Sequence, residues 1–161
     1  MKGILTPVLQ ETVNYVNALV IAKERGINIV ESKTAQVQDF ASLIVVEVDT
    51  DKQQSSICGT LFTKVDPRIV KINEFYVDCV PEGNMLVVFN KDVPGIIGQI
   101  GTIFGKNSIN VASVSFGREA KGGKAISVWN VDSDVSKNVL DELKSAKNIY
   151  EVKLVKLSKT A

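Results

Sequence analysis

The chain has 161 residues, of which 45% are hydrophobic and 23% are charged, and its formal net charge is +1. This is the composition of an ordinary globular protein, and a charge this small gives no reason to expect nucleic acid or an anionic membrane surface as a partner. There is no histidine, which excludes Ser–His and Cys–His nucleophile pairs and imidazole bases. Catalysis would have to rest on carboxylates or lysines alone.

Hydrophobic runs are about five residues at most, whereas roughly 20 are needed to cross a bilayer. We therefore expect no membrane association, no signal peptide and a cytoplasmic location. Cys58 and Cys79 both lie in strand-like apolar segments, which predicts two buried free thiols in a reducing compartment. Without histidine or a Cys-x-x-Cys pair, no metal site is expected.

The first half of the chain predicts one helix followed by strands. Hydrophobic residues recur at helical spacing between Glu11 and Arg25, and Gly26 is a typical helix end. Residues 1–11, with Pro7, have little pattern and resemble an interdomain linker. Alternating or continuous apolar segments then predict strands over 27–34, 41–50 and 57–62, and a hairpin over 67–84.

The second half predicts the order β-α-β-β-α-β, which is the ferredoxin-like arrangement. Its strands are expected at 85–90, 109–119, 125–132 and 149–157, and its helices at 94–106 and 133–148, the latter with Ser133 or Asp134 as its N-cap. The turn formers Pro81–Asn84 separate the two halves. We expect an α+β protein of two small α/β sandwich domains, residues 1–82 and 83–161.

Glycines at 98, 101 and 105 lie on one stripe of the first helix of the second domain. Each costs up to about 1 kcal/mol relative to alanine in a helix interior, so a reason for them is needed. They do not match the G-x-G-x-x-G or Walker patterns that cradle phosphates. Two explanations stay open: close approach of the helix to its own sheet, or contact with another subunit.

A candidate ligand site precedes this helix. Gly95 follows Pro94 in the first turn, where free backbone N–H groups and the helix dipole favour an anion. Asp92 lies just before, either as an N-cap or as a partner for an ammonium group. Asn110 begins the next strand, which we expect to pair with the strand ending near Asn90, and its amide can donate and accept. A carboxylate beside an anion-accepting helix start suits a free α-amino acid.

The segments "VFNKDVPGIIGQIGTIFGKNSINVASVSFGR" and "GGKAISVWNVDSDV" resemble an ACT domain of the type at the C-terminus of D-3-phosphoglycerate dehydrogenase. Upstream, "ETVNYVNALVIAKERGI", "GTLF", "PRIVKIN" and "VDCVPEGNMLV" resemble the intervening, allosteric substrate-binding domain of the long bacterial form. Together these segments cover nearly the whole chain in the family's order.

The resemblance implies that L-serine binds at a junction between ACT domains, which pair side by side into one eight-stranded sheet of a homo-oligomer. The positions that hold serine in the family fall on Asn90, Asp92 and Asn110. It also implies that the chain has no catalytic residues and no cofactor of its own, with NAD bound by the catalytic part of a parent enzyme.

The resemblance further implies an anion site in the first domain, for phosphate or a phosphorylated hydroxy acid. Arg68 matches one basic position of that site, and Lys64 and Lys71 are candidates by proximity. A second basic position of the family falls on Val80. The alternative for Arg68 is an exposed strand residue without a ligand.

Two functions follow. The first is a non-catalytic regulatory region of an NAD-dependent phosphoglycerate dehydrogenase of serine biosynthesis, with L-serine as feedback effector. The second is a stand-alone regulatory module, or a small subunit related to iron-sulfur L-serine dehydratase. An in-frame nicotinamide-binding domain upstream of Met1 would distinguish them.

Overall fold

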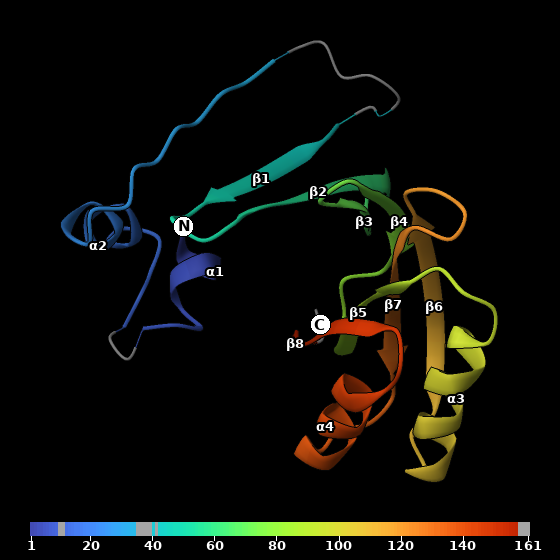
Figure 1. Ribbon diagram of the computed structural model, residues 1–161. Coiled ribbons are helices and arrows are strands. Elements are labelled where there is room, and N and C mark those ends of the chain that lie inside the picture. Colours follow the sequence, from blue (N-terminus) through green and yellow to red (C-terminus); the bar gives the residue numbers. More distant parts are fainter. Residues whose placement is uncertain (10–11, 35–39, 41, 158–161) are drawn as a thin grey trace. The chain divides into compact units, whose positions relative to one another are not determined.

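The computed structural model describes residues 1–9, 12–34, 40 and 42–157 (Figure 1). The chain divides into two compact units, Met1–Gln36 and Val37–Ala161. None of the helices within the described ranges is long and apolar enough to cross a membrane.

The first unit contains the helices α1, Lys2–Leu5, and α2, Ala18–Glu24. The predicted helix from Glu11 is therefore too long, and Glu11 itself lies outside the described residues. The side chain of Asn14 accepts hydrogen bonds from the backbone N–H groups of Val16 and Asn17, at 2.8 and 2.9 Å. Such local bonds compete with helical ones, so α2 starts only after Asn17.

The core of this unit is small and apolar. It consists of Leu5, Val13, Ala18, Ile21 and Ala22. The helix α2 is followed by Gly26 in the left-handed conformation, with φ of 71°, as expected for a glycine at a helix end. The strand predicted over residues 27–34 is wrong, because the backbone there forms neither helix nor strand.

The second unit begins with a four-stranded antiparallel sheet in the order β1-β2-β3-β4. Its strands are β1, Ile44–Asp49; β2, Gln54–Thr63; β3, Asp66–Ile72; and β4, Phe75–Cys79. The predicted strands and hairpin of this segment are confirmed. Asn73 lies between β3 and β4 with φ of 51°, a conformation that asparagine tolerates better than most residues.

The remaining elements form a second four-stranded antiparallel sheet with two helices. They are β5, Asn84–Lys91; α3, Ile96–Lys106; β6, Val111–Arg118; β7, Lys124–Val131; α4, Lys137–Ser145; and β8, Ile149–Lys156. The strand order β6-β7-β5-β8 confirms the ferredoxin-like arrangement. The expected cap of α4 is wrong by two or three residues, because Ser136 is the N-cap and its side chain accepts from the Val139 N–H.

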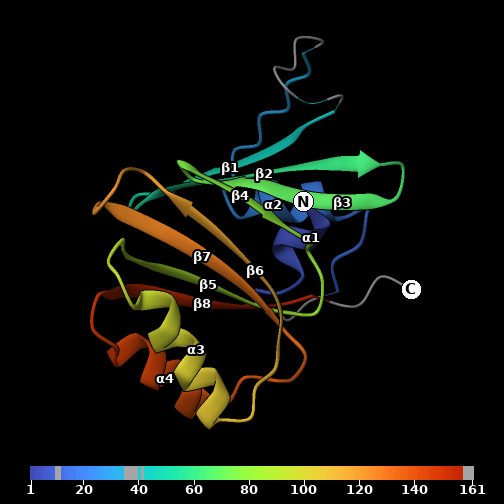
Figure 2. The ribbon, with the colours of Figure 1, turned by 90° about the vertical axis from the view of Figure 1, so that its right-hand side faces the viewer.

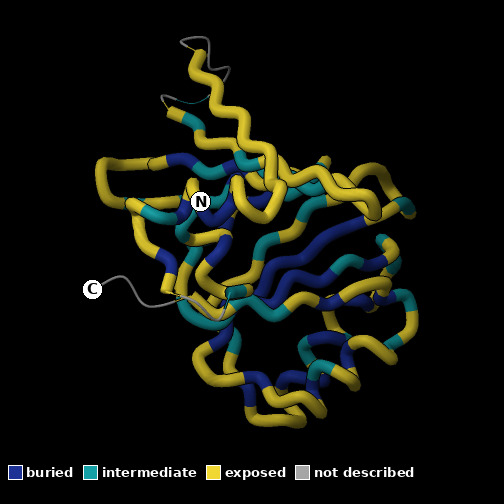
Figure 3. Tube along the Cα trace, turned by 90° about the vertical axis from the view of Figure 1, so that its left-hand side faces the viewer, coloured by how far each residue is buried: buried dark blue, intermediate teal, exposed yellow. Residues whose placement is uncertain are grey.

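The second sheet is covered on both faces (Figure 2). On one face α3 and α4 bury a large apolar cluster around Leu86, Phe104 and Trp129. On the other face the first sheet packs through a cluster of Phe75, Val77, Cys79, Met85, Val87, Ile126 and Val128. The strands β5 and β7 are therefore buried along almost their whole length (Figure 3).

This packing bears on the expected division of the chain at residues 82 and 83. The first sheet and the ferredoxin-like part belong to one compact unit, and the division by compactness falls between Gln36 and Val37. Cys79 and Met85, on either side of the expected boundary, share one apolar cluster. The boundary at 82/83 is thus one of sequence pattern, while the compact unit continues across it.

Candidate effector site

Asp92 follows the end of β5 and is held by the turn between β6 and β7. Its carboxylate oxygen Oδ2 accepts from the backbone N–H of Gly122, at 3.0 Å, and from Nη1 of Arg118, at 3.2 Å. Its own backbone N–H donates to the carbonyl of Gly123, at 2.8 Å. The Gly122 N–H, together with Arg118, lowers the pKa of the Asp92 carboxyl below its usual range, so the group is an anion at neutral pH.

The N-cap of α3 is Gly95, with φ of 90° and no side-chain capping bond. The interpretation of Asp92 as the cap is therefore wrong, and its carboxylate remains available for other partners. Only glycine adopts this backbone conformation without strain. No side chain caps α3, and the backbone N–H of Ile96 donates to the carbonyl of Val93, at 3.4 Å. The anion site expected at Pro94 and Gly95 stays a prediction, which rests on the polarity of a helix start.

Asn90 lies in β5 and is buried, with 3% of its surface exposed. Its Nδ2 donates to the carbonyl of Lys91 at 2.8 Å. The side chain thus has a local partner and reaches solvent very little. Within this chain Asn90 supports the end of β5 rather than presenting an amide at the surface.

Asn110 is exposed and precedes β6. The expectation that β6 pairs with β5 is wrong, because β6 pairs with β7. Nδ2 of Asn110 donates to Oδ2 of Asp132, and the backbone N–H of Asp132 donates to the Asn110 carbonyl at 3.1 Å. Asn110 therefore lies next to the C-terminal end of β7, where Val131 is the last residue.

Asp92 and Asn110 consequently lie at opposite ends of the sheet. Asn90 pairs with Ala125 at the beginning of β7, whereas Val111 pairs with Val131 at its end. A strand advances about 3.3 Å per residue, which puts the two ends about 20 Å apart. One serine molecule cannot contact both residues of a single chain.

The glycine stripe of α3 faces away from the sheet. A Cβ placed on Gly98, Gly101 or Gly105 would have no other atom within 4 Å. Close approach of α3 to its own sheet is therefore not the reason for these glycines. Contact with another subunit remains the open explanation of the two.

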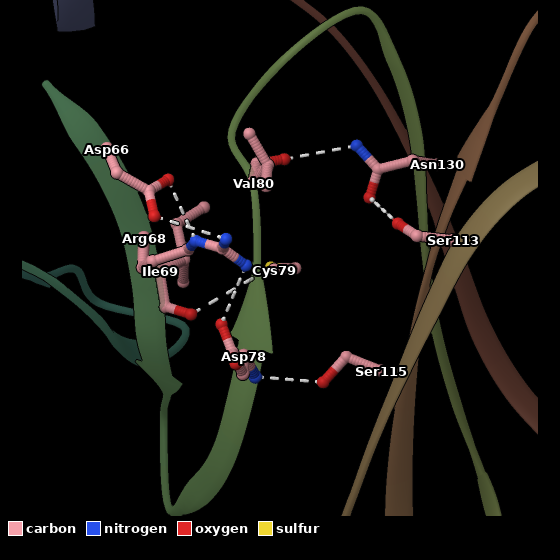
Figure 4. A network of polar contacts seen from close by, with 9 residues as sticks. All are labelled: Asp66, Arg68, Ile69, Asp78, Cys79, Val80, Ser113, Ser115 and Asn130. Carbon is pink, nitrogen blue, oxygen red and sulfur yellow. Dashed lines mark hydrogen bonds and ion pairs between the residues drawn. The ribbon is translucent and has the colours of Figure 1, made fainter. Parts of the chain in front are cut away.

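Arg68, the candidate anion ligand of the first sheet, is bound by two carboxylates (Figure 4). Its Nε and Nη2 donate to the two oxygens of Asp66, at 3.1 and 3.3 Å, and its Nη1 donates to Asp78, at 3.3 Å. These bonds, above all the one to Asp66, raise the pKa of Arg68 further above its ordinary value. A bound anion would have to displace at least one carboxylate.

Within the described part of the chain, neither of the other candidates for this anion site forms an ion pair with Asp66 or Asp78, the two carboxylates that bind Arg68. Lys71 has its Nζ 5.2 Å from the centre of the Tyr76 ring, and Lys64 is exposed in the turn between β2 and β3. The carbonyl of Val80 accepts from Nδ2 of the buried Asn130, at 3.0 Å, and Ser113 donates to the Asn130 side-chain oxygen, at 3.3 Å (Figure 4). This network joins the segment between β4 and β5 to β6 and β7.

The sequence did not indicate two side chains of the site, Arg118 and Asp132. Their places depend on the register of the β6–β7 hairpin, in which Arg118 pairs with Ala125. Among the residues that the structure describes, no group of three or more His, Cys, Asp or Glu side chains is arranged to hold a metal ion.

Comparison with known proteins identifies both halves of the chain. Residues 1–73 match the family described as D-3-phosphoglycerate dehydrogenase intervening domain. Residues 84–148 match the ACT domain family.

Relatives named D-3-phosphoglycerate dehydrogenase match along almost the whole chain. The proteins from Synechocystis and Bacillus subtilis are each 36% identical over 157 residues, and the one from Methanocaldococcus jannaschii is 34% identical over 157 residues. Each match covers 98% of this chain but only 28–30% of the relative. The chain therefore consists of a D-3-phosphoglycerate dehydrogenase intervening domain over residues 1–73 followed by an ACT domain over residues 84–148, and it spans less than a third of the length of these relatives.

Proposed function

We propose that this chain is the regulatory region of an NAD-dependent D-3-phosphoglycerate dehydrogenase and binds L-serine as a feedback effector. The observation that carries the proposal is the ionised carboxylate of Asp92, three residues before Gly95, the N-cap of α3 that has no side-chain capping bond. A zwitterion can lie there with its ammonium toward Asp92 and its carboxylate toward the helix start. The names of the relatives favour this function over a subunit of L-serine dehydratase.

The proposal includes a homodimer of ACT domains. Asp92 and Asn110 lie at opposite ends of one sheet, so they can share a ligand only if Asn110 comes from a second copy. The strand β6 is at the edge of its sheet, and unpaired edges favour association with another strand. The exposed Gly98 and Gly105 would allow the helices of two copies to approach closely.

A second ligand, phosphate or a phosphorylated hydroxy acid, is proposed for Arg68. Support comes from the forked guanidinium, which suits oxyanions. Asp66 and Asp78 compete for the same donors, so we expect weak binding.

Calorimetric titration of L-serine into the unaltered chain and into Asp92→Asn tests the main proposal. The substitution keeps the size of the side chain and removes its charge. Hydrogen bonds to charged groups contribute about 1.5–3 kcal/mol, so we expect serine to bind roughly 10- to 100-fold more weakly. Equal affinity in both proteins would show that Asp92 does not hold the ammonium. Glycine and alanine should bind more weakly than serine, because they leave the partner of its hydroxyl unpaired.

A further inference from the structure

Arg118 brings a cation next to the proposed ammonium ligand. It is the last residue of β6, and its Nη1 lies 3.2 Å from Oδ2 of Asp92, which follows β5. The two residues are 26 positions apart in sequence and are brought together by the β6–β7 hairpin. An acid and a base are therefore juxtaposed at the end of the sheet where α3 begins.

The contact leaves polar atoms of both side chains unused. Both hydrogen bonds to Asp92 go to Oδ2, and among the described residues Oδ1 accepts none. Arg118 donates only from Nη1, so within the same part of the chain Nε and Nη2 have no acceptor. The pair therefore has an open carboxylate oxygen and two open guanidinium donors.

We propose that Arg118 binds the α-carboxylate of the amino acid whose ammonium is held by Asp92. This inference rests on the proposed function and names a further residue of the same site. The charges of an α-amino acid are separated by a single carbon atom, so they require an acid and a base that lie side by side. A guanidinium binds a carboxylate through two parallel hydrogen bonds, which a helix N-terminus alone does not offer.

A purely structural role for the ion pair between Arg118 and Asp92 accounts for fewer of these observations than a role in ligand binding. The Arg118 side chain is 60% exposed, and exposed pairs contribute little to stability. Asp92 is positioned in any case by the Gly122 N–H, which is also the largest cause of its lowered pKa. Arg118 is thus free to turn toward a ligand without releasing the carboxylate of Asp92.

The test is calorimetric titration of the whole chain with L-serine and with L-serinamide, in which an amide replaces the carboxylate. Arg118→Gln removes the guanidinium, and Lys121→Gln is the control because it removes a charge from the same turn. We expect Arg118→Gln to weaken L-serine by roughly 10-fold and to leave L-serinamide unchanged. Lys121→Gln should leave both ligands close to the affinities of the unaltered chain.

Failure of this inference and failure of the proposed function give different results. If the unaltered chain binds L-serine and Arg118→Gln binds it equally well or more tightly, Arg118 is not the carboxylate ligand and the proposed function stands. If Arg118→Gln weakens L-serine and L-serinamide equally, the inference is also overturned, because the carboxylate is then not what Arg118 recognises. If the unaltered chain binds no L-serine at millimolar concentration, the proposed function itself fails.

Discussion

Gly117 in β6 lies directly against the backbone carbonyl of Tyr76 in β4, and a Cβ on Gly117 would overlap with that oxygen. The same Cβ would lie 3.2 Å from Cγ2 of Ile126 and 3.3 Å from Cβ of Phe75. Next to this contact the backbone N–H of Asp78 donates to Oγ of Ser115, at 2.8 Å (Figure 4). The absence of a side chain at Gly117 thus lets the first sheet pack on the ACT sheet.

We predict that Gly117→Ala destabilises the chain by about 2 kcal/mol, because overpacking costs about 1–3 kcal/mol and a backbone carbonyl cannot move aside like a flexible side chain. The measurement is urea unfolding followed by circular dichroism. Gly59→Ala in β2 is the matched control, since its Cβ would lie 3.5 Å from the Arg68 carbonyl oxygen, an ordinary van der Waals distance, and it should be neutral or stabilising by up to about 1 kcal/mol. A Gly117→Ala protein as stable as the unaltered chain would contradict the observed packing.

Ser127 and Trp129 share a hydrogen bond inside the ACT core. The indole Nε1 donates to Oγ of Ser127 at 2.8 Å, and both residues are buried. Ser127→Ala leaves the indole N–H unpaired, which should cost about 1–3 kcal/mol and alter the fluorescence of the chain's single tryptophan. Ser145→Ala removes an exposed hydroxyl that bonds to the carbonyl of Asp141, and we expect it to cost less than about 0.5 kcal/mol. Equal effects of the two substitutions would argue against the buried bond.

We predict from the buried thiol of Cys79 that the free energy of unfolding decreases at alkaline pH. Burial raises the pKa of its thiol from 9.0 to about 11. Between these values the unfolded chain loses this proton while the folded chain keeps it. The contribution of the protonated thiol to the free energy of unfolding is therefore complete below about pH 9 and is lost as pH rises toward 11. Denaturant unfolding between pH 8 and 11 should show a shallower decline for Cys79→Ala than for the unaltered chain. Parallel declines would show that the thiol does not contribute.

We predict that phosphate competes with the carboxylates of Asp66 and Asp78 for the guanidinium of Arg68. If Arg68 binds phosphate, Asp78→Asn frees its Nη1 and should enlarge the rise in melting temperature that phosphate causes, while Arg68→Ala should abolish it. Thermal unfolding with and without tens of millimolar phosphate, at constant ionic strength, is the measurement. A rise that survives in Arg68→Ala would place the anion elsewhere.

Hydrophobic periodicity was sufficient to predict the order of helices and strands in the ACT part of the fold. Mostly apolar segments mark β5 and β7, which are buried along almost their whole length. The helical spacing of α3 and α4 reflects burial of one face of each helix against the sheet. The first 36 residues were harder, because Asn14 stops the helix through side-chain bonds that apolar spacing does not reveal. Residues 27–34 have strand-like composition but no strand partner in the structure.

The candidate site was predictable only where one local segment forms it. Asp92, Pro94 and Gly95 all lie within the four residues that precede α3, so their proximity follows from the helix boundary. Arg118 lies next to Asp92, and Asp132 lies next to Asn110 at the opposite end of the sheet. Both placements depend on the register of β6 and β7, which a single sequence does not specify. Because the pairing of β6 with β5 expected from the sequence is incorrect, the separation of Asp92 from Asn110 could not be predicted.

The central claim is that serine is bound between two copies, by Asp92 of one and Asn110 of the other. The most direct measurement is calorimetric titration of L-serine into Asp92→Asn, into Asn110→Ala, and into an equimolar mixture of both after subunit exchange. In each mixed dimer one site has both substitutions and the other has neither, so about a quarter of the sites in the mixture should recover the affinity of the unaltered chain if exchange is random. A mixture that exchanges subunits but binds serine no better than its two components would contradict a site shared between copies.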